Sequence, residues 1–290
     1  MKKLVFSIFI NIPDDRLDNP GWWENGEQVV TNKSKNTKLA LLNNAKGITA
    51  RHLEYATAID ADYILFEYDD NDKAFFDTIV TKYPEISEYD IVNFYKHRVM
   101  RDMADKYDLV CYIDFDVIPD TTEDIFDNHR LDTSFAVADT NRAAIRGKVM
   151  DANGYSFCIR NPASKYWNTH ALLMEDGYDP ENDVFNTGIM VASSEVIKQL
   201  DYFKNFVYII NRMTEIKHEE FSLYHPNIQR VFNYDNETVF SYLIKIRNIE
   251  VQYMSTLWHF VVDETVRTVD MLNPKAHMYH FINKKMEWIL

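Results

Sequence analysis

The chain has 290 residues, of which 46% are hydrophobic, and its formal net charge is −14. This length suits one large α/β domain or two small ones with a sizeable core, and the hydrophobic content excludes wholesale disorder. The excess of 45 acidic over 31 basic residues argues against a nucleic-acid-binding surface, which is normally basic. A phosphate-bearing substrate would therefore need a metal ion and a few placed Lys or Arg side chains.

The cysteines and the amino-terminal segment bear on the compartment. Cys111 and Cys158 do not make a disulfide framework, which suits a reducing compartment. Residues 4–10 form an apolar run, but Asn-Ile-Pro-Asp-Asp follows it instead of a small-residue cleavage site, so a first strand explains the run better than a signal peptide. No run approaches the roughly 20 apolar residues of a membrane span. We expect a soluble, cytoplasmic protein without integral membrane association.

The amino-terminal part of the chain alternates between strand-like and helix-like segments. Residues 3–10 are a near-continuous apolar run of strand length, and residues 62–68 predict a second strand. Residues 36–59, between them, carry apolar side chains at three- and four-residue spacings, with a break expected at Gly47. Residues 88–107 predict another amphipathic helix. This order implies parallel strands joined by right-handed crossovers.

Two aspartates follow a third strand, and the rest of the chain is organised around them. Residues 109–113 are a short apolar run rich in β-formers, and Asp114 and Asp116 come directly after it. In an extended segment this spacing places both carboxylates on one side. Two hard oxygen ligands at the end of a central strand suit a divalent ion that also holds phosphate oxygens. The alternative is a strand-ending turn in which each carboxylate caps a backbone N–H.

Later segments give further structural expectations. Residues 121–126 combine a hydroxyl cap with an acidic first turn, which predicts the start of a short helix. Residues 134–139 predict a strand that ends in an aspartate. Residues 140–184 are polar with few periodicities, and because long irregular insertions are often functional, we expect an acceptor-binding loop there. Residues 194–213 predict one amphipathic helix, with Val207 among the residues that face a core.

The apolar strand followed by Asp-x-Asp resembles the DxD motif of GT-A-fold glycosyltransferases. Three further segments follow in an order similar to that of the glycogenin-like branch, glycosyltransferase family 8: Phe185-Asn-Thr-Gly, the segment around Asp235, and His280-Phe281. The resemblance implies an α/β GT-A (Rossmann-like) fold, with a mixed, mostly parallel central sheet flanked by helices. It also implies a single domain over residues 1–290. Residues 1–139 would bind the nucleotide sugar, and residues 140–290 would bind the acceptor and carry a C-terminal metal and phosphate segment.

The resemblance implies roles for several residues around the donor sugar. Asp139, at the end of its strand, matches an aspartate that binds donor-sugar hydroxyls, and Asn186 matches an asparagine whose side chain lies beside the sugar. Gly188 would let the backbone approach closely. Asp235 matches an acidic residue that faces the donor sugar, and it can also cap the helix that begins there. Asn236 stands where the family has Gln.

Metal and phosphate ligands are implied near the carboxyl terminus. His280 matches the family's third protein ligand to manganese, and imidazole beside two carboxylates suits that ion. His259 is the competing candidate, and we favour His280 because basic residues follow it. The family's lysine that holds a diphosphate oxygen corresponds to Lys284 or Lys285, and the spacing does not choose between them.

Two other segments are expected to contact the nucleotide. Lys96 and Arg101 loosely match a basic residue that, in the family, contacts the diphosphate from the helix before the DxD strand; the alternative is an ordinary solvated helix face. Ile10 and Asn11 follow the first strand at the carboxyl edge of the sheet, where ligands bind in open α/β folds.

The resemblance implies a metal-dependent glycosyltransferase. It would move a hexosyl group from a nucleotide-diphosphate sugar, UDP-linked by default, to an acceptor hydroxyl on a glycan, with Mn²⁺ or Mg²⁺ as cofactor. Two alternatives stay open. One is a haloacid-dehalogenase-like Mg²⁺-dependent phosphatase with Asp114 as nucleophile, although that motif usually opens its domain and over 100 residues precede it here. The other is a non-catalytic nucleotide-sugar-binding module.

Overall fold

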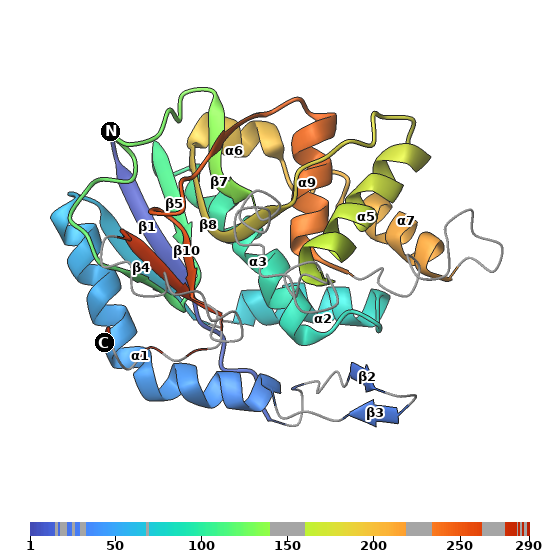
Figure 1. The fold of residues 1–290 in the computed structure, drawn as a ribbon, viewed down its shortest axis with the longest axis horizontal. Helices are drawn as coiled ribbons and strands as arrows, with labels where there is room; N and C mark the ends of the chain where they lie inside the picture. Colours follow the sequence, from blue (N-terminus) through green and yellow to red (C-terminus); the bar gives the residue numbers. More distant parts are fainter. Residues whose placement is uncertain are drawn as a thin grey trace, which may run out of the picture.

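Short runs of strands and helices follow one another along the described part of the chain (Figure 1). In this computed structural model the described residues are 1–14, 17, 22–24, 27–29, 33–67, 70–139, 160–218, 234–262, 276–282, 284, 286 and 289–290. The strands are β1 (Lys3–Ile8), β2 (Trp22–Glu24), β3 (Glu27–Val29), β4 (Asp62–Phe66), β5 (Leu109–Ile113), β6 (Val117–Pro119), β7 (Ser134–Asp139), β8 (Phe185–Ser193), β9 (Glu250–Tyr253), β10 (Phe260–Val262) and β11 (Met278–Phe281). The helices are α1 (Lys33–Ala58), α2 (Asp70–Lys82), α3 (Glu88–Met103), α5 (Arg160–Glu175), α6 (Ser194–Leu200), α7 (Phe206–His218) and α9 (Asn236–Ile246).

The larger sheet has six strands in the order β4-β1-β5-β8-β7-β9. β1 pairs in parallel with β4 and β5, and β7 pairs in parallel with β9. β8 runs antiparallel to both of its neighbours, β5 and β7. The prediction of an α/β fold with a mixed, mostly parallel sheet is therefore confirmed, and so are the strands expected at 109–113 and 134–139.

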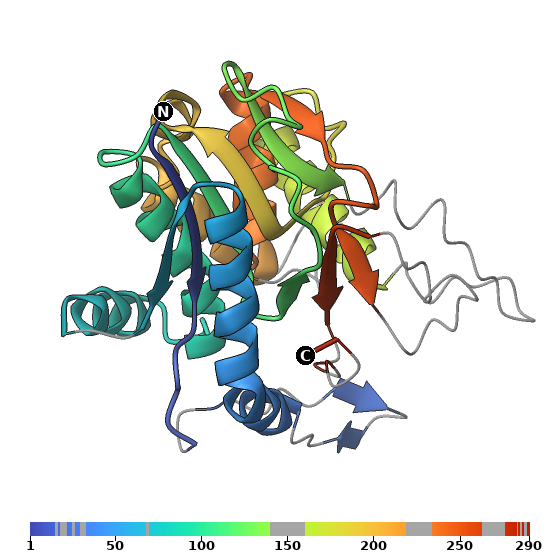
Figure 2. The ribbon, with the colours of Figure 1, turned by 90° about the vertical axis from the view of Figure 1, so that its left-hand side faces the viewer.

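Side chains alternate between the two faces of this sheet, as strand geometry requires. On one face, Phe6 of β1 and Tyr112 of β5 join a core that includes residues of α3, α6 and α9. On the other face, Val5 and Cys111 pack with the second half of α1, which lies in front of the strands in Figure 2. Both faces of the central strands are thus apolar, which explains why these strands appear in the sequence as continuous apolar runs.

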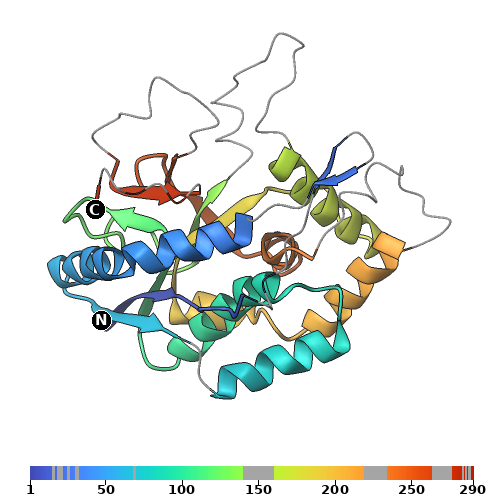
Figure 3. The same ribbon diagram turned by 90° about the horizontal axis from the view of Figure 1, so that it is seen from below.

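A second, three-stranded sheet has the order β10-β11-β6. β11 pairs in parallel with β10 and antiparallel with β6. Ile48 of α1 packs with Ile118 of β6 and Phe281 of β11, so the same helix contacts both sheets, and Figure 3 shows it running past them. The chain passes from the large sheet to the small one between β5 and β6, and Asp114 and Asp116 lie in this connection.

Gly47 does not break the first helix, contrary to expectation. α1 is continuous over Lys33–Ala58, and a Cβ atom built at Gly47 would lie 3.6 Å from the Leu290 side chain, in ordinary contact. One helical glycine costs only about 1 kcal/mol relative to alanine. Burial of the α1 face against two sheets outweighs this cost.

The single helix expected over residues 194–213 is also wrong. The chain forms α6 and α7 instead, and Asp201 between them caps α6 in a left-handed conformation with φ 38°. This change of direction places Val207 on the surface, where 47% of it is exposed, although the sequence pattern predicted that it faces a core.

Two other segments differ from their predictions. Residues 121–126 form turns and no helix, and Asp124 Oδ1 accepts a hydrogen bond from the backbone N–H of Phe126 at 2.8 Å. Within the irregular segment expected over 140–184, residues 160–175 form the helix α5, whereas 140–159 lie outside the described residues. None of the described helices is long and apolar enough to cross a membrane.

Candidate metal centre

Asp114 and Asp116 lie in a tight turn at the junction of the two sheets. The Asp114 backbone N–H donates to the Gly188 carbonyl at 2.7 Å, and the Val117 N–H donates to the Asp114 carbonyl at 2.9 Å. The chain therefore turns here, where an extended segment was expected. Among the described residues, no backbone N–H donates to either carboxylate, so the capping alternative does not account for the two side chains.

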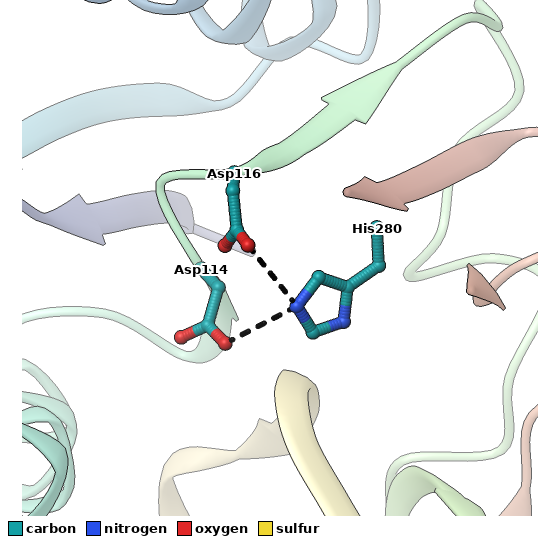
Figure 4. Close-up of side chains that lie close together, drawn as sticks. All are labelled: Asp114, Asp116 and His280. Atoms are coloured by element: carbon teal, nitrogen blue, oxygen red, sulfur yellow. Dashed lines mark ion pairs between the residues drawn. The ribbon is translucent and has the colours of Figure 1, made fainter. Parts of the chain in front are cut away.

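His280 of β11 faces both carboxylates. Its Nε2 atom lies 3.7 Å from Asp114 Oδ2 and 3.5 Å from Asp116 Oδ2 (Figure 4). The pairing of β11 with β6 places His280 opposite Val117, and the Phe281 N–H donates to the Asp116 carbonyl at 3.0 Å. The three side chains each offer a ligand atom, and these atoms lie within 4.8 Å of one another. Two segments 164 residues apart in sequence (280 minus 116) are thus joined at one point.

Gly188 makes room for the His280 ring. A Cβ atom built at this position would lie 2.5 Å from Cε1 and 2.8 Å from Nδ1 of His280. The His280 ring is buried and faces the two carboxylates, so it has little space to move away from an added side chain at position 188. The family resemblance implied that Gly188 lets the backbone approach closely, and in this structure the group in close contact with it is the imidazole of His280.

Two lysines balance the charge of the carboxylates. The Lys284 ammonium pairs with Asp116 Oδ2, and the buried Lys96 ammonium lies 3.5 Å from Asp114 Oδ1. Burial alone would raise the pKa of Asp116, but the Lys284 ammonium and the neighbouring His280 ring hold that pKa well below its ordinary value. Asp116 is therefore ionised at neutral pH, as a metal-binding carboxylate must be.

Lys96 also connects the cluster to β8. Its ammonium donates to the Thr187 carbonyl at 3.1 Å. The Tyr112 hydroxyl donates to Asp114 Oδ1, on the same carboxylate oxygen that Lys96 approaches. Asp114 is thus oriented from the interior of the protein by two side chains.

The three residues expected at the donor sugar lie near the ends of β7, β8 and α9. Asp139 is buried at the end of β7, where it pairs with Phe185, the residue before Asn186. Asn186 Oδ1 accepts a hydrogen bond from the Gly188 N–H at 2.8 Å, which brings Asn186 beside the cluster. Asp235 caps α9 and accepts from the Glu237 N–H at 2.7 Å, as its sequence position allowed.

A buried polar network, which the sequence analysis missed, extends from the cluster to α9. The Thr187 N–H donates to Glu237 Oε1 at 3.0 Å, and the Thr187 hydroxyl donates to Asn236 Oδ1 at 2.8 Å. Lys165 pairs with Glu237 and lies 3.6 Å from Asp235 Oδ2. Burial would lower the pKa of Lys165, but these two carboxylates raise it above its ordinary value. The one sequence signal for this network was the pair of acidic residues, Asp235 and Glu237, in the segment that resembles a family motif.

The structure does not bring all of the remaining residues predicted to contact the nucleotide to one place. Ile10 and Asn11 follow β1, and because β1 is parallel to β5 they lie beyond the same edge of the sheet as Asp114. Next to them, the ring of Phe9 stacks on Phe115 with centroids 4.8 Å apart.

Arg101 lies toward the opposite edge. It is near the end of α3, which leads into the beginning of β5, whereas the cluster follows the end of that strand. Its guanidinium pairs with Asp105 at 3.0 Å. Lys284 occupies the position beside Asp116, while Lys285 lies outside the described residues.

His259 does not belong to the group of ligand atoms but contacts it from behind. Among the described residues, that group consists of Asp114, Asp116 and His280. Burial and the neighbouring His280 hold the pKa of His259 well below its usual value, so its ring is neutral.

No protein-family model and no curated protein sequence matches the chain. Among solved structures, it is similar to a glycosyltransferase involved in the glycosylation of the major capsid of PBCV-1, with 10% identity, 97% of this chain and 93% of that chain covered, and a TM-score of 0.44. It is also similar to the galactosyltransferase LgtC in complex with donor and acceptor sugar analogs (13% identity, 97% and 87% covered, TM-score 0.45). A third is mouse xyloside xylosyltransferase 1 (10% identity, 97% and 98% covered, TM-score 0.46). These TM-scores lie below 0.5, so the functional interpretation rests on the geometry of the site itself.

Proposed function

We propose that the chain is a metal-dependent glycosyltransferase of the GT-A fold. It transfers a hexosyl group from a nucleotide-diphosphate sugar, with UDP as the favoured nucleotide, to an acceptor hydroxyl on a glycan. The observation that carries the proposal is the convergence of Asp114, Asp116 and His280 at the end of a central strand, with the Lys284 ammonium on the same cluster.

The residues of the cluster fit a divalent cation. Two carboxylates and one imidazole are a donor set that suits Mn²⁺, with Mg²⁺ as the alternative, and the low pKa of Asp116 keeps that ligand ionised. When bound, the cation would act as a Lewis acid on the leaving nucleoside diphosphate.

The lysines of the site have separate tasks in this proposal. Lys284 comes from the segment after β11 and pairs with Asp116, from which its ammonium can reach a diphosphate oxygen of the donor. Lys96 is buried between Asp114 and the Thr187 carbonyl, so it orients the Asp114 carboxylate from within. Positive charge held in place beside a leaving group stabilises the transition state more than the ground state.

Asp139, Asn186 and Asp235 bind the hydroxyls of the donor sugar in this proposal. Asn186 accepts a hydrogen bond from Gly188, which contacts the cluster. Asp139 pairs across the β7–β8 ladder with Phe185, the residue directly before Asn186. Holding the sugar at several hydroxyls fixes the anomeric carbon near the acceptor. Residues 1–139 then form the nucleotide-sugar-binding half of one domain, and residues 140–290 supply the acceptor side and the metal and phosphate segment.

Isothermal titration with UDP and GDP tests the proposal, in Mn²⁺ and in EDTA. We expect one nucleotide to bind in Mn²⁺ and binding to fall at least tenfold in EDTA or in Asp116→Asn, because the nucleotide diphosphate loses its metal contact. Asp105→Asn is the matched control, since Asp105 is an exposed aspartate that pairs with Arg101. Nucleotide binding that ignores both Mn²⁺ and Asp116 would contradict the proposal. UDP release from a set of UDP-sugars then identifies the donor.

No observation favours the phosphatase alternative. Asp114 Oδ1 accepts from Tyr112 and approaches Lys96, while Oδ2 faces His280, where the candidate ligand atoms converge. The binding-module alternative predicts the same nucleotide binding without turnover, so the release assay separates it from an enzyme.

A further inference from the structure

A second imidazole supports the candidate metal ligand. Nε2 of His259 lies 2.9 Å from Nδ1 of His280, and the two rings stack with centroids 5.1 Å apart and an interplanar angle of 24°. Both side chains are buried. In Figure 4 the Nδ1 atom of His280 lies on the side of the ring away from the two carboxylates. His259 therefore touches His280 at the nitrogen that does not face the cluster.

The backbone places His259 at this position. The His259 N–H donates to the Ser255 carbonyl at 3.2 Å in the turn before β10. β10 then runs parallel to β11, with Val261 opposite His280. Nδ1 of His259 has no hydrogen-bond partner among the described residues. Among those residues, the hydrogen bond that orients the His259 ring is therefore the one between its Nε2 and His280.

The position of one proton on His280 decides whether the ring can bind a cation. An imidazole coordinates a metal through an unprotonated nitrogen, and the hydrogen bond at its other nitrogen selects which one is free. With the proton on Nδ1, His280 donates to Nε2 of His259 and directs its Nε2 lone pair at the carboxylates. With the proton on Nε2 instead, His280 accepts from His259 and has no lone pair at the cluster.

We propose that His259 is a positioning residue that accepts the Nδ1 proton of His280 and so presents the Nε2 lone pair to a divalent cation at Asp114 and Asp116. This inference rests on the proposed metal centre. It also accounts for the confinement of the His280 ring, which lies between His259 on one side and the close backbone of Gly188 on another. His259 acts through His280 and does not itself contact the cation.

Mn²⁺ binding to the full chain tests this role. Electron paramagnetic resonance titration gives the Mn²⁺ affinity of the wild type, His259→Phe, His259→Asn and His259→Gln. Removal of a hydrogen-bond partner behind a ligand typically lowers metal affinity about 10- to 100-fold, so we expect such a loss in the Phe variant, which has no acceptor. The Asn side chain is too short to reach Nδ1 and should behave in the same way. Gln can place its oxygen near the position of Nε2 and should recover most of the affinity.

Electron spin-echo modulation from imidazole nitrogen provides a readout that a purely structural role would not change. The modulation is assigned to His280 by its loss in His280→Ala, and we expect it to change in His259→Phe and His259→Asn because the Nδ1–H has lost its acceptor. His129→Gln is the matched control: His129 is another buried imidazole, whose Nδ1 lies 2.8 Å from the Ile125 carbonyl and whose ring packs against Trp258, with neither His259 nor His280 among its described contacts.

The outcomes separate the two proposals. If the wild type binds no Mn²⁺, or Asp116→Asn binds it equally well, the metal centre itself is refuted. If the wild type binds Mn²⁺ through Asp116 but both loss variants keep the wild-type affinity and nitrogen modulation, the metal centre stands and the role of His259 is overturned. Loss in the Phe and Asn variants with recovery in the Gln variant supports it.

Discussion

The protein has two pairs of acidic residues that are close in sequence, and the two pairs have different surroundings. Asp114 and Asp116, the motif acids, are approached by the side chains of lysines, a tyrosine and a histidine. Asp235 and Glu237, the cap acids, accept hydrogen bonds from backbone N–H groups, and Lys165 pairs with both of them. Each pair is compensated, but by different kinds of partner.

The difference separates acids held by backbone N–H groups from acids whose oxygens converge with a histidine on one point. A carboxylate that accepts from backbone N–H groups orders the chain around it, as Asp235 does at the start of α9. The motif acids instead have oxygens that converge on one point with His280 Nε2. Side-chain partners of this kind can rearrange around a ligand without any break in the backbone ladder. We therefore expect changes near the motif acids to alter metal binding, and loss of the lysine that pairs with the cap acids to alter stability rather than metal binding.

The largest effect is expected from Gly188→Ala. The added Cβ would meet the His280 ring at 2.5 Å, so the ring must leave its position and the proposed metal centre loses one of its ligands. Because the change removes a direct ligand, we expect Mn²⁺ affinity to fall by more than about 100-fold, beyond the effect of losing an outer partner. Gly177→Ala is the control, since Gly177 has positive φ but nothing within 4 Å of its Cβ position. A Gly188→Ala protein with wild-type Mn²⁺ affinity would refute the arrangement.

A smaller effect, on stability, should follow from Lys165→Met. This change leaves Glu237 and Asp235 without their shared cation. Unpairing a buried charge costs about 3–5 kcal/mol, and because Lys165 retains some exposure we expect about 2–3 kcal/mol less free energy of unfolding in urea. The double variant with Glu237→Gln should recover part of the loss. A large change in Mn²⁺ affinity without a stability loss would contradict the distinction between the two pairs.

His52, which belongs to neither pair, is expected to lower the free energy of unfolding at acidic pH. Burial lowers its pKa to about 4, while its ring contacts Ser7 and the Val117 carbonyl. Below pH 6.5, the ordinary pKa of histidine, His52 binds a proton in the unfolded chain but stays neutral in the folded chain. Stability therefore falls as the pH decreases from about 6.5 toward 4. At pH 5 the loss should be about 2 kcal/mol.

Urea unfolding at pH 7 and pH 5 measures this loss. His52→Gln should remove most of the difference. An equal pH dependence in wild type and His52→Gln would show that other groups cause it.

The smallest effect is expected from Arg101→Ala. Arg101 forms an exposed i,i+4 pair with Asp105, which lies just beyond the end of α3, and exposed pairs of this kind contribute little to stability. Nucleotide affinity should remain within about twofold of wild type, because Arg101 lies toward the edge of the sheet opposite the motif acids. A tenfold loss of nucleotide affinity would restore the sequence-based prediction that this residue contacts the diphosphate.

Local patterns in the sequence determined much of the large sheet. The apolar runs at 109–113 and 134–139 became β5 and β7 with those bounds, because a strand buried on both faces requires an unbroken run of apolar residues. The cap at Asp235 and the two carboxylates of the motif are equally local, since a cap and a turn each involve residues a few positions apart. Packing overrode the local signal at Gly47, where the helix continued.

The rest of the site was decided by the tertiary structure. His280 reaches Asp116 because β11 pairs with β6, and Lys165 reaches Glu237 because α5 packs on α9. Gly188 meets His280, and His259 supports it, through contacts between segments that are far apart in sequence. The sequence by itself determined the motif acids and the strands that carry them. The imidazole, the lysines and the support behind them depend on strand and helix pairing over long sequence separations, which no periodicity within one segment records.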